Sequence, residues 1–184
     1  MIDRARMMEV IISNHYLKSV PSGKSHYYSH DGAIIVFSIP ANYNTSRFLI
    51  GEPKGVWELS RLWAADDHAP NLLTKIIKIA IRQLRLDEPD VVALISYADP
   101  NAGHQGGVYK AASWQFIGVS EESRGYKGPD GLFVPRRKFH SGSRHLNKQE
   151  IEALGYTQMK MPGKRRFAKG LTRRSRKLIT QRFA

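Results

Sequence analysis

The chain has 184 residues, which is enough for one domain with a sizeable core and barely enough for two. Its apolar fraction of 41% and charged fraction of 24% are those of an ordinary soluble globular protein. The sequence contains no cysteine, which excludes disulfides, a thiolate nucleophile and cysteine-ligated zinc or iron–sulfur clusters. No apolar run approaches the length of about 18 residues that a transmembrane helix needs, and the first residues lack the apolar region of a signal peptide. The expected location is therefore the cytoplasm.

The positive charge is concentrated in the last third of the chain. The net charge is +13; residues 1–123 carry 12 Lys/Arg against 13 Asp/Glu, whereas residues 124–184 carry 17 against 3. A basic region of this kind suits a polyanion, because neutralising phosphates releases counterions. A solvated basic tail is the simpler alternative. A membrane-surface segment is disfavoured, because the region lacks a strong apolar face.

Two strands are predicted in the first part of the chain. Residues 33–39 form an apolar run that Pro40 closes, and residues 56–63 follow a turn rich in glycine and proline. Strict alternation along residues 56–63 would place four side chains on one face: Trp57, Leu59, Arg61 and Trp63. Two interpretations of Arg61 stay open. It stacks on an indole or reaches out from an edge strand, or its guanidinium points into a site for an anion or a carboxylate.

An amphipathic helix and a buried strand come next. Apolar residues recur at helical spacing over residues 71–85, and Pro70 suits the entry of such a helix. Residues 91–97 are almost all apolar, as expected for a central strand buried on both faces. A second helix is predicted over about residues 108–116, with Tyr109 turned away from its apolar side. This order indicates an α/β fold with a mixed central sheet flanked by helices.

Functional sites in such sheets gather at the carboxyl ends of strands. One candidate site lies where strand 56–63 ends and helix 71–85 begins. The other follows strand 91–97 and contains Asp99, His104 and Tyr109. Simpler interpretations are that Asp99 is a turn residue, that His104 is a loop histidine and that Tyr109 packs with its hydroxyl satisfied.

Residues 96–118 carry the most specific motif of the chain, with Ser-Tyr-Ala-Asp at 96–99, Gly-His at 103–104 and Tyr109. This segment resembles the Mom family of DNA-modification proteins from Mu-like bacteriophages. The resemblance covers roughly residues 12–120, and its other parts are Trp-Glu-Leu-Ser-Arg-Leu at 57–62, Ala-Pro-Asn at 69–71 and Asn-His-Tyr at 14–16. Mom proteins are similar in fold to GCN5-related N-acetyltransferases. The resemblance therefore implies that fold here, with a basic C-terminal extension.

The resemblance also implies a function. Mom proteins convert the exocyclic amine of adenine in duplex DNA to a carbamoylmethyl (acetamido) derivative, which protects phage DNA from host restriction. The activity implied is that of a DNA adenine N6-modifying transferase, with double-stranded DNA as the partner and the host cytoplasm as the location. Two alternatives stay open: an acyl-CoA-dependent N-acetyltransferase acting on RNA or protein, and a non-catalytic nucleic-acid-binding protein.

Five residues are candidates for catalysis: Asp99, Tyr109, Arg61, His15 and Tyr16. Asp99 would hold or deprotonate the adenine amine, and Tyr109 would donate to a developing oxyanion. Arg61 would orient a carboxylate or carboxamide through its planar fork. His15 and Tyr16 take part only if the N-terminal segment folds over the sheet. The set His15, Tyr16, Asp99 and Tyr109 also offers hard nitrogen and oxygen ligands for iron or zinc.

A small-molecule donor would bind at the start of helix 71–85, with cofactor contacts expected at Ala69, Asn71 and Leu72. The similarity in fold to acetyltransferases makes acetyl-CoA one candidate donor. However, residues 65–71 contain no glycine, and Asp66 and Asp67 would repel a pyrophosphate. Another small donor therefore stays open.

The basic residues supply the predicted DNA contacts. Residues 1–123 are expected to form the catalytic core, and residues 124–184 a basic region that is packed on the same domain and contributes DNA-binding surface. Phosphate contacts are expected from Arg136, Arg137, Lys138, Arg144, Lys164, Arg165, Arg166, Arg173 and Arg174. Three aromatic residues among them are candidates for stacking on an extruded or neighbouring base: Phe139, Tyr156 and Phe167. A homodimer is left open, and no membrane contact is expected.

Overall fold

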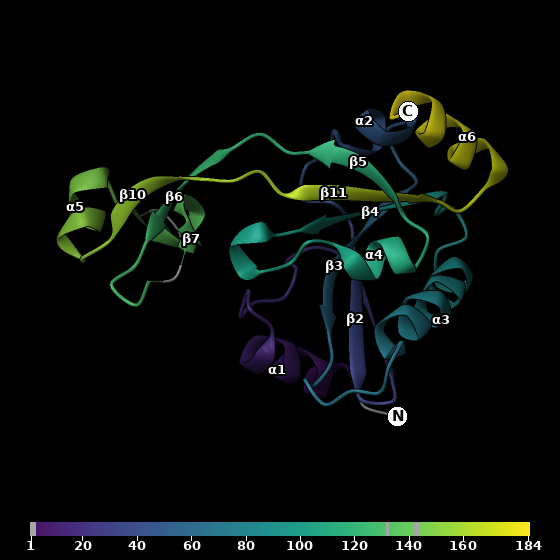
Figure 1. The fold of residues 1–184 in the computed structure, drawn as a ribbon, viewed down its shortest axis with the longest axis horizontal. Coiled ribbons are helices and arrows are strands. Elements are labelled where there is room, and N and C mark those ends of the chain that lie inside the picture. Colours follow the sequence, from purple (N-terminus) through teal and green to yellow (C-terminus); the bar gives the residue numbers. More distant parts are fainter. Residues whose placement is uncertain (1–2, 132, 142–143) are drawn as a thin grey trace. The chain divides into compact units, whose positions relative to one another are not determined.

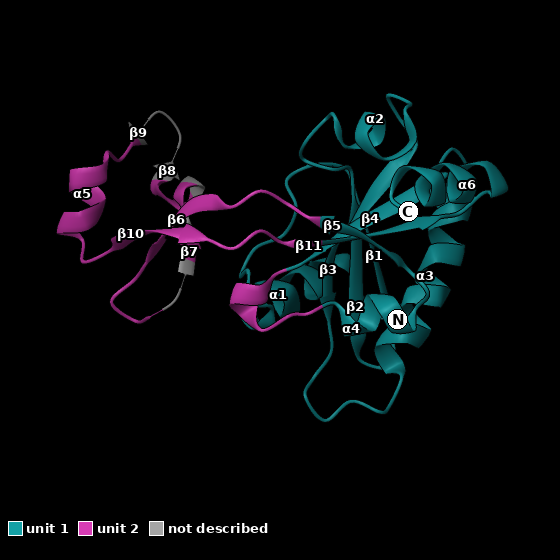
Figure 2. Ribbon diagram, turned by 45° about the horizontal axis from the view of Figure 1, so that its top comes forward, with its two compact units in different colours: residues 1–98, 106–118, 166–184 teal, residues 99–105, 119–165 magenta. Residues whose placement is uncertain are grey.

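A computed structural model describes residues 3–131, 133–141 and 144–184, with all of their side chains except those at 133, 135, 137, 140, 141 and 144. The chain forms two compact units (Figure 2). The sheet unit comprises Met1–Ala98, Gly106–Gly118 and Arg166–Ala184, and the small unit comprises Asp99–Gln105 and Val119–Arg165. This division differs from the expected linear boundary at residue 123, because the chain returns to the sheet unit at Arg166.

The sheet unit is built on six strands in the order β1-β2-β3-β4-β11-β5 (Figure 1). β1 and β3 pair antiparallel with β2, and β4 pairs parallel with β3, so the sheet is mixed. Its elements are α1 (Arg4–Asn14), β1 (Ser25–His30), β2 (Ala33–Ser38), α2 (Thr45–Ile50), β3 (Val56–Trp63), α3 (Leu72–Asp87), β4 (Ala93–Ala98), α4 (Gly107–Ala111), β5 (Gln115–Val119), β11 (Arg165–Gly170) and α6 (Arg173–Arg182).

Helices cover both faces of this sheet. α3 and α4 pack on one face through a cluster that includes Ile76, Leu94 and Phe167. On the other face, α1 packs against β2, and α2 and α6 pack against β3 and β4. The predicted mixed α/β sheet flanked by helices is therefore confirmed. No helix in the described ranges is long and apolar enough to cross a membrane.

The apolar patterns correctly predicted the central elements. All six residues of β2 are buried, β4 has buried residues on both faces, and α3 buries its apolar stripe against the sheet. Such patterns are reliable because each residue's face follows directly from the strand or helix period.

The expectation that Trp57, Leu59, Arg61 and Trp63 share one face is wrong, because β3 contains a bulge. Val36 of β2 pairs with Arg61 and Phe37 pairs with Leu59, which leaves Ser60 as the extra residue. Leu62 therefore continues the face of Trp57 and Leu59. Trp63 packs on the opposite face, in the cluster that includes α1.

The second predicted helix is shorter than expected. α4 ends at Ala111, Ser113 adopts a left-handed φ of 59°, and β5 begins at Gln115, so Phe116 lies in a strand. Tyr109 was expected to point away from the apolar side of this helix. It is instead only 8% exposed and packs in the core cluster.

The small unit has its own three-stranded sheet in the order β10-β6-β7. Its elements are η1 (Pro100–Ala102), β6 (Ser123–Lys127), β7 (Phe133–Pro135), η2 (Arg136–Phe139), β8 (His140–Ser141), β9 (Arg144–His145), α5 (Lys148–Ala153) and β10 (Thr157–Met161). Phe139 packs edge-on against Tyr126 and Tyr156 in this unit's core. Phe167 is fully buried in the sheet unit. The expectation that Phe139 and Phe167 stack on a base is therefore wrong.

Glu88 at the end of α3 is expected to contribute to stability in a pH-dependent way. Hydrogen bonds from Lys24 and His26 lower the pKa of Glu88 below its ordinary value, so the ionised form stabilises the native state. This stabilisation is complete above the unfolded pKa and is lost as the pH falls through the folded pKa. Glu88→Gln should cost up to about 1 kcal/mol at pH 7, and the cost should vanish in acid. Urea unfolding at pH 7 and in acid measures this difference in the free energy of unfolding.

The control for Glu88→Gln is Glu9→Gln, which removes the exposed Arg6–Glu9 pair on α1. Because both side chains of that pair are well exposed, this variant should unfold like the unmodified protein at either pH. A Glu88→Gln deficit that persisted unchanged in acid would contradict the role given to the carboxylate.

Candidate functional site at the end of the β3–β4 ladder

The parallel pairing of β3 and β4 is short. It runs from Val56 opposite Ala93 to Leu59 opposite Ser96, whereas β3 continues to Trp63 and β4 to Ala98. The last pair thus lies toward the carboxyl ends of both strands, where α/β sheets place their ligands. Ser96 is the polar residue at this point and is buried.

A hydrogen-bonded pair of hydroxyls marks the end of the ladder. The Ser96 Oγ lies 2.8 Å from the Leu59 carbonyl oxygen and 2.8 Å from the Tyr109 hydroxyl oxygen. Ser96 has one proton for these two oxygens, and a carbonyl only accepts. When Ser96 donates to Leu59, the Tyr109 hydroxyl donates to Ser96. When Ser96 donates to Tyr109 instead, the phenol proton is available to another acceptor.

Tyr109 packs against two aromatic rings of the sheet unit. Its ring centroid lies 5.2 Å from that of Phe167 and 5.5 Å from that of Trp114. Burial raises the pKa of Tyr109, the Glu58 carboxylate adds to this, and the hydrogen bond from Ser96 opposes it. The phenol is therefore protonated at neutral pH and can act as a hydrogen-bond donor.

Lys169 of β11 fixes the turn that follows α4. Its Nζ donates to the carbonyl oxygens of Ala112 and Ser113, at 2.7 and 3.2 Å. Burial, followed by the charge of Arg176, lowers the pKa of Lys169. The ammonium thus satisfies carbonyls at the end of the helix that carries Tyr109.

His15, Tyr16 and Arg61 lie in or beside the segment that links α1 to β1. The rings of His15 and Tyr16 stack with centroids 4.5 Å apart, and His15 Nδ1 accepts from the Leu17 amide. The Arg61 guanidinium donates to the carbonyl and hydroxyl oxygens of Ser19, at 2.8 and 3.3 Å. Arg61 therefore binds the chain just beyond His15 and Tyr16.

Asp99 belongs to the small unit, although it directly follows β4. Its Oδ2 lies 2.9 Å from the Lys164 Nζ, and its Oδ1 accepts from the backbone and side-chain nitrogens of Asn101, each at 3.0 Å. Burial would raise the pKa of Asp99, but Lys164 and Asn101 outweigh it and hold the pKa below its ordinary value. Asp99 is thus both a turn residue and an ionised, buried carboxylate.

No metal-binding cluster of three or more His, Asp or Glu side chains occurs in the described part of the chain. Within the set proposed for iron, His15 accepts from Leu17, Tyr109 bonds Ser96, and Asp99 is paired with Lys164. The set is therefore not supported as an assembled metal site.

A cavity of about 430 Å³ lies at the start of α3. Ala69 and Leu72, two of the residues expected to contact a cofactor, line it, and Asn71 is the N-cap of α3 with a left-handed φ of 63°. Lys75, the single Lys or Arg among the described lining residues, is paired with Asp31 at 3.0 Å. With Asp67 also in the wall, these residues do not fit the pyrophosphate of CoA.

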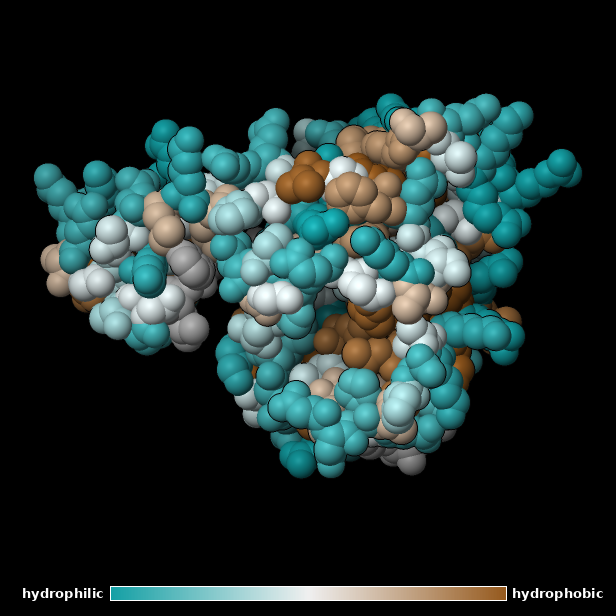
Figure 3. Space-filling view, in the orientation of Figure 1, coloured by the Kyte–Doolittle hydropathy of each residue, from teal (hydrophilic) through white to brown (hydrophobic). Residues whose placement is uncertain are grey.

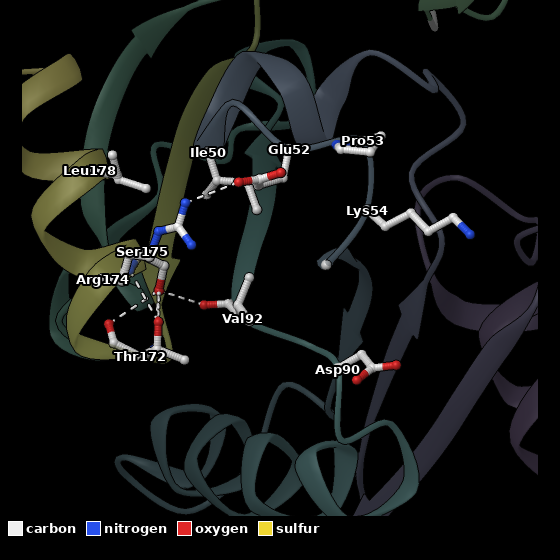
Figure 4. A pocket seen from close by; sticks show the side chains of 11 residues that line it. Ile50, Glu52, Pro53, Lys54, Asp90, Val92, Thr172, Arg174, Ser175 and Leu178 are labelled. Carbon is white, nitrogen blue, oxygen red and sulfur yellow. Dashed lines mark hydrogen bonds and ion pairs between the residues drawn. The ribbon is translucent and has the colours of Figure 1, made fainter.

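A second cavity, of about 540 Å³, lies at the opposite ends of β3 and β4, beside α6 (Figure 4). Several of its polar wall groups bind one another: Arg174 pairs with Glu52 at 3.0 Å, and the Ser175 hydroxyl donates to the Val92 carbonyl at 2.6 Å. Its other walls contain the apolar side chains of Ile50 and Leu178 and the opposite charges of Lys54 and Asp90. We therefore do not place the reaction here.

The predicted phosphate contacts differ widely in exposure. Arg136, Lys138 and Arg173 are exposed, and Arg174 is exposed although it pairs with Glu52. Lys164, Arg165 and Arg166 are half-buried, and they contact Asp99, Gln105 and the Phe48 ring, respectively. The side chains of Arg137 and Arg144 lie outside the described ones.

The outer face of α6 carries a dense group of exposed positive charges. Its exposed basic residues are Arg173, Arg174, Arg176, Lys177 and Arg182. α6 contains no acidic residue and buries Ser175 and Ile179 on its inner face. Hydrophilic side chains project from this region at the upper right of Figure 3. The face is suited to a polyanion.

Sequence reasoning missed Ser96, Asn101 and Lys169. The signal for Ser96 was available, because a serine within an otherwise apolar, doubly buried strand needs a hydrogen-bond partner. Lys169 and Asn101 carried no comparable signal, since their partners are set by the turns that the chain makes around them.

Comparison with known proteins finds a similar structure and a similar sequence. An acetyltransferase of Bacillus subtilis, solved in complex with CoA, superposes with a TM-score of 0.44 at 8% identity, over 88% of this chain and 83% of that chain. "Methylcarbamoylase mom" of Escherichia phage Mu is 34% identical over 92 residues. That match covers 49% of this chain but only 38% of the phage protein.

A family model matches almost the whole chain, from residue 1 to residue 182. The matched range includes the Ser96–Tyr109 pair, Asp99 and the segment of His15 and Tyr16. The chain belongs to the Mom protein family.

Proposed function

We propose that this protein transfers a carbamoylmethyl group to the exocyclic amine of adenine in double-stranded DNA. Membership of the Mom family and the name of the phage Mu relative, a methylcarbamoylase, support this reaction. The structural observation that carries it is the buried, protonated Tyr109 beside Ser96 at the end of the β3–β4 ladder. A protonated phenol in this place can stabilise negative charge as it develops.

The transfer replaces one N–H of the amine by an N–C bond. The bond between the methylene carbon and the donor's leaving group breaks, the electron pair departs with the leaving group, and the proton lost by the amine passes to the departing leaving group or to water. Tyr109 donates a hydrogen bond to the leaving group as it gains charge. The lowered pKa of Asp99 makes it a weak base, so its proposed role is to accept a hydrogen bond from the amine and hold it.

Arg61 takes a different role from the one expected from the sequence. Because its guanidinium bonds Ser19, we assign it to holding the segment that carries His15 and Tyr16. The charges at the start of α3 disfavour an acyl-CoA donor, since Asp67 lines the cavity and Lys75 is already paired with Asp31. A donor without a pyrophosphate fits this proposal better.

Mass spectrometry of deoxynucleosides tests the reaction. Genomic DNA from bacteria expressing the protein should contain a deoxyadenosine that is heavier by a carbamoylmethyl substituent. DNA from cells expressing Asp99→Ala, at equal protein levels, should lack it. Unmodified DNA in cells that contain the folded, DNA-binding protein would contradict the proposed reaction.

The exposed face of α6 is proposed to contact the DNA backbone. Arg173→Gln, Arg176→Gln and Lys177→Gln together should weaken binding to duplexes of every sequence. They should also reduce the slope of log K against log salt by up to about 0.9 for each phosphate that the helix no longer neutralises. Fluorescence anisotropy with labelled duplexes at several salt concentrations gives both quantities.

A matched control separates this surface from net charge alone. Lys78, Arg82 and Arg85 are three exposed basic residues on α3 of the same unit. Changing them to glutamine removes the same charge from another helix and should leave the slope nearly unchanged. Equal losses of affinity in both triple variants would mean that only the total charge matters.

A further inference from the structure

Lys164 and Asp99 form an ion pair in which the carboxylate is largely shielded from water. The Lys164 Nζ lies 2.9 Å from the Asp99 Oδ2, and the two side chains are 35% and 8% exposed. The Lys160–Glu122 pair of the same unit is longer, at 3.6 Å, and its side chains are 84% and 63% exposed. Of these two pairs, only the first therefore holds its carboxylate away from water.

The backbone around Lys164 is fixed by a close approach to Ser120. The Lys164 amide donates to the Ser120 Oγ, and the Ser120 amide donates to the Lys164 carbonyl, each at 2.9 Å. Gly163 allows this approach, because a Cβ there would lie 1.8 Å from the Ser120 carbonyl oxygen. The position from which the lysine reaches Asp99 is therefore set by the backbone, not by the side chain alone.

The other carboxylate oxygen is held as well. Asp99 Oδ1 accepts from both nitrogens of Asn101 at 3.0 Å, while Oδ2 faces Lys164. Donors on both oxygens fix the plane of a carboxylate, and Oδ2 can still accept one more hydrogen bond. This is the arrangement expected where a carboxylate must present a lone pair in one defined direction.

We propose that Lys164 is a positioning residue for Asp99 and not a phosphate contact. The inference rests on the proposed function, in which Asp99 holds the adenine amine. It separates Lys164 from the exposed basic residues of the small unit, such as Arg136 and Lys138, whose side chains stand in solvent. If the Lys164 ammonium left Asp99 to bind a phosphate, the buried Asp99 carboxylate would lose its counter-ion. The cost of that unpaired buried charge offsets what the phosphate contact would contribute.

Three variants of the full-length chain test the proposal: Lys164→Met, Lys164→Arg and the control Lys160→Met. Binding to a duplex is measured at several salt concentrations, and modified deoxyadenosine is measured in cells. Lys164→Met should lower the modified fraction at least tenfold and leave the salt slope as it is in the unmodified protein. Lys164→Arg should restore part of the modification, because a guanidinium can still pair with the carboxylate. Lys160→Met should modify DNA normally.

Two results would overturn the positioning role. One is a salt slope lowered by about 1 in Lys164→Met, with modification reduced only in proportion to affinity, which identifies a phosphate contact. The other is normal modification by Lys164→Met. If Lys164→Met does not fold, Lys164→Gln provides the second variant, since it removes the ammonium and keeps a polar side chain. It should lower modification at an unchanged slope, and normal modification would again overturn the proposal.

Failure of the proposed function is recognisable in the same data. It would appear as unmodified DNA with the unaltered protein. The salt slope of Lys164→Met would still decide, independently of any activity, whether Lys164 contacts phosphates.

Discussion

Tyr109→Phe is expected to lower adenine modification by about 100-fold or more, which is the usual contribution of a positioned acid or donor. The change removes only the hydroxyl, so the ring keeps its contacts with Trp114 and Phe167. Ser96 can still donate to the Leu59 carbonyl, so its own proton keeps an acceptor. Stability should fall by about 1 kcal/mol, the value of one hydrogen bond. Deoxynucleoside mass spectrometry and thermal unfolding measure the two effects.

Tyr97→Phe is the matched control for this prediction. Tyr97 lies on the same strand as Ser96 but packs on the opposite face of the sheet, where its hydroxyl bonds Thr45 and its pKa is also raised, mainly by burial. The variant therefore makes the same chemical change in a similar environment. A comparable loss of modification in both variants would show that Tyr109 acts through packing or stability, and not through its hydroxyl.

Gly106→Ala is expected to destabilise the protein by about 2–4 kcal/mol and to abolish modification at about 37 °C. Gly106 has a φ of 82°, and a Cβ there would lie 2.2 Å from the Phe167 ring, which is fully buried. The ring cannot move aside, because it also packs on Tyr109 and Phe116. Urea unfolding measures the loss, and the double variant Gly106→Ala with Phe167→Leu should recover part of it.

Gly32→Ala controls for backbone strain alone. Gly32 has a φ of 81°, almost the same as that of Gly106, but nothing lies within 4 Å of a Cβ built there. The cost should therefore be about 1 kcal/mol, as expected for a left-handed backbone without a clash. If the two alanine variants were equally unstable, contact with Phe167 would not be the reason that position 106 requires glycine.

The elements that the sequence predicted well are those whose own residue pattern indicates which side chains are buried. β2 and β4 are almost continuous apolar runs, and α3 has an apolar stripe at helical spacing. These patterns depend only on the residues of each element and not on the elements that pack against it. The face of Arg61 could not be predicted, because the bulge at Ser60 depends on the register with β2. The end of α4 depends on Ser113 and on Lys169, which lies 56 residues further along the chain.

Individual residues of the candidate site could be predicted from the sequence, but the residues that they bind could not. Asp99 and Tyr109 were singled out from one short motif, and both are buried and hydrogen-bonded. That Lys164 pairs with Asp99 was not predictable, since 65 residues separate them and a cluster of basic residues suggests phosphate contacts first. Charge composition indicates that a surface attracts polyanions, but it does not distinguish a lysine in solvent from one that is already paired.

The order of strands in the sheet has a consequence for how such proteins diversify. β5 and β11 are neighbours in the sheet, and most of the small unit is the excursion between them. Both ends of that excursion start from adjacent positions, so its length and sequence can change without altering the strand order. The segment between β5 and β11 can therefore be replaced by another segment during evolution. Such a replacement leaves Tyr109 and its partners in the sheet unit unchanged. The new segment must still supply a cation for Asp99, because that carboxylate remains with the host chain.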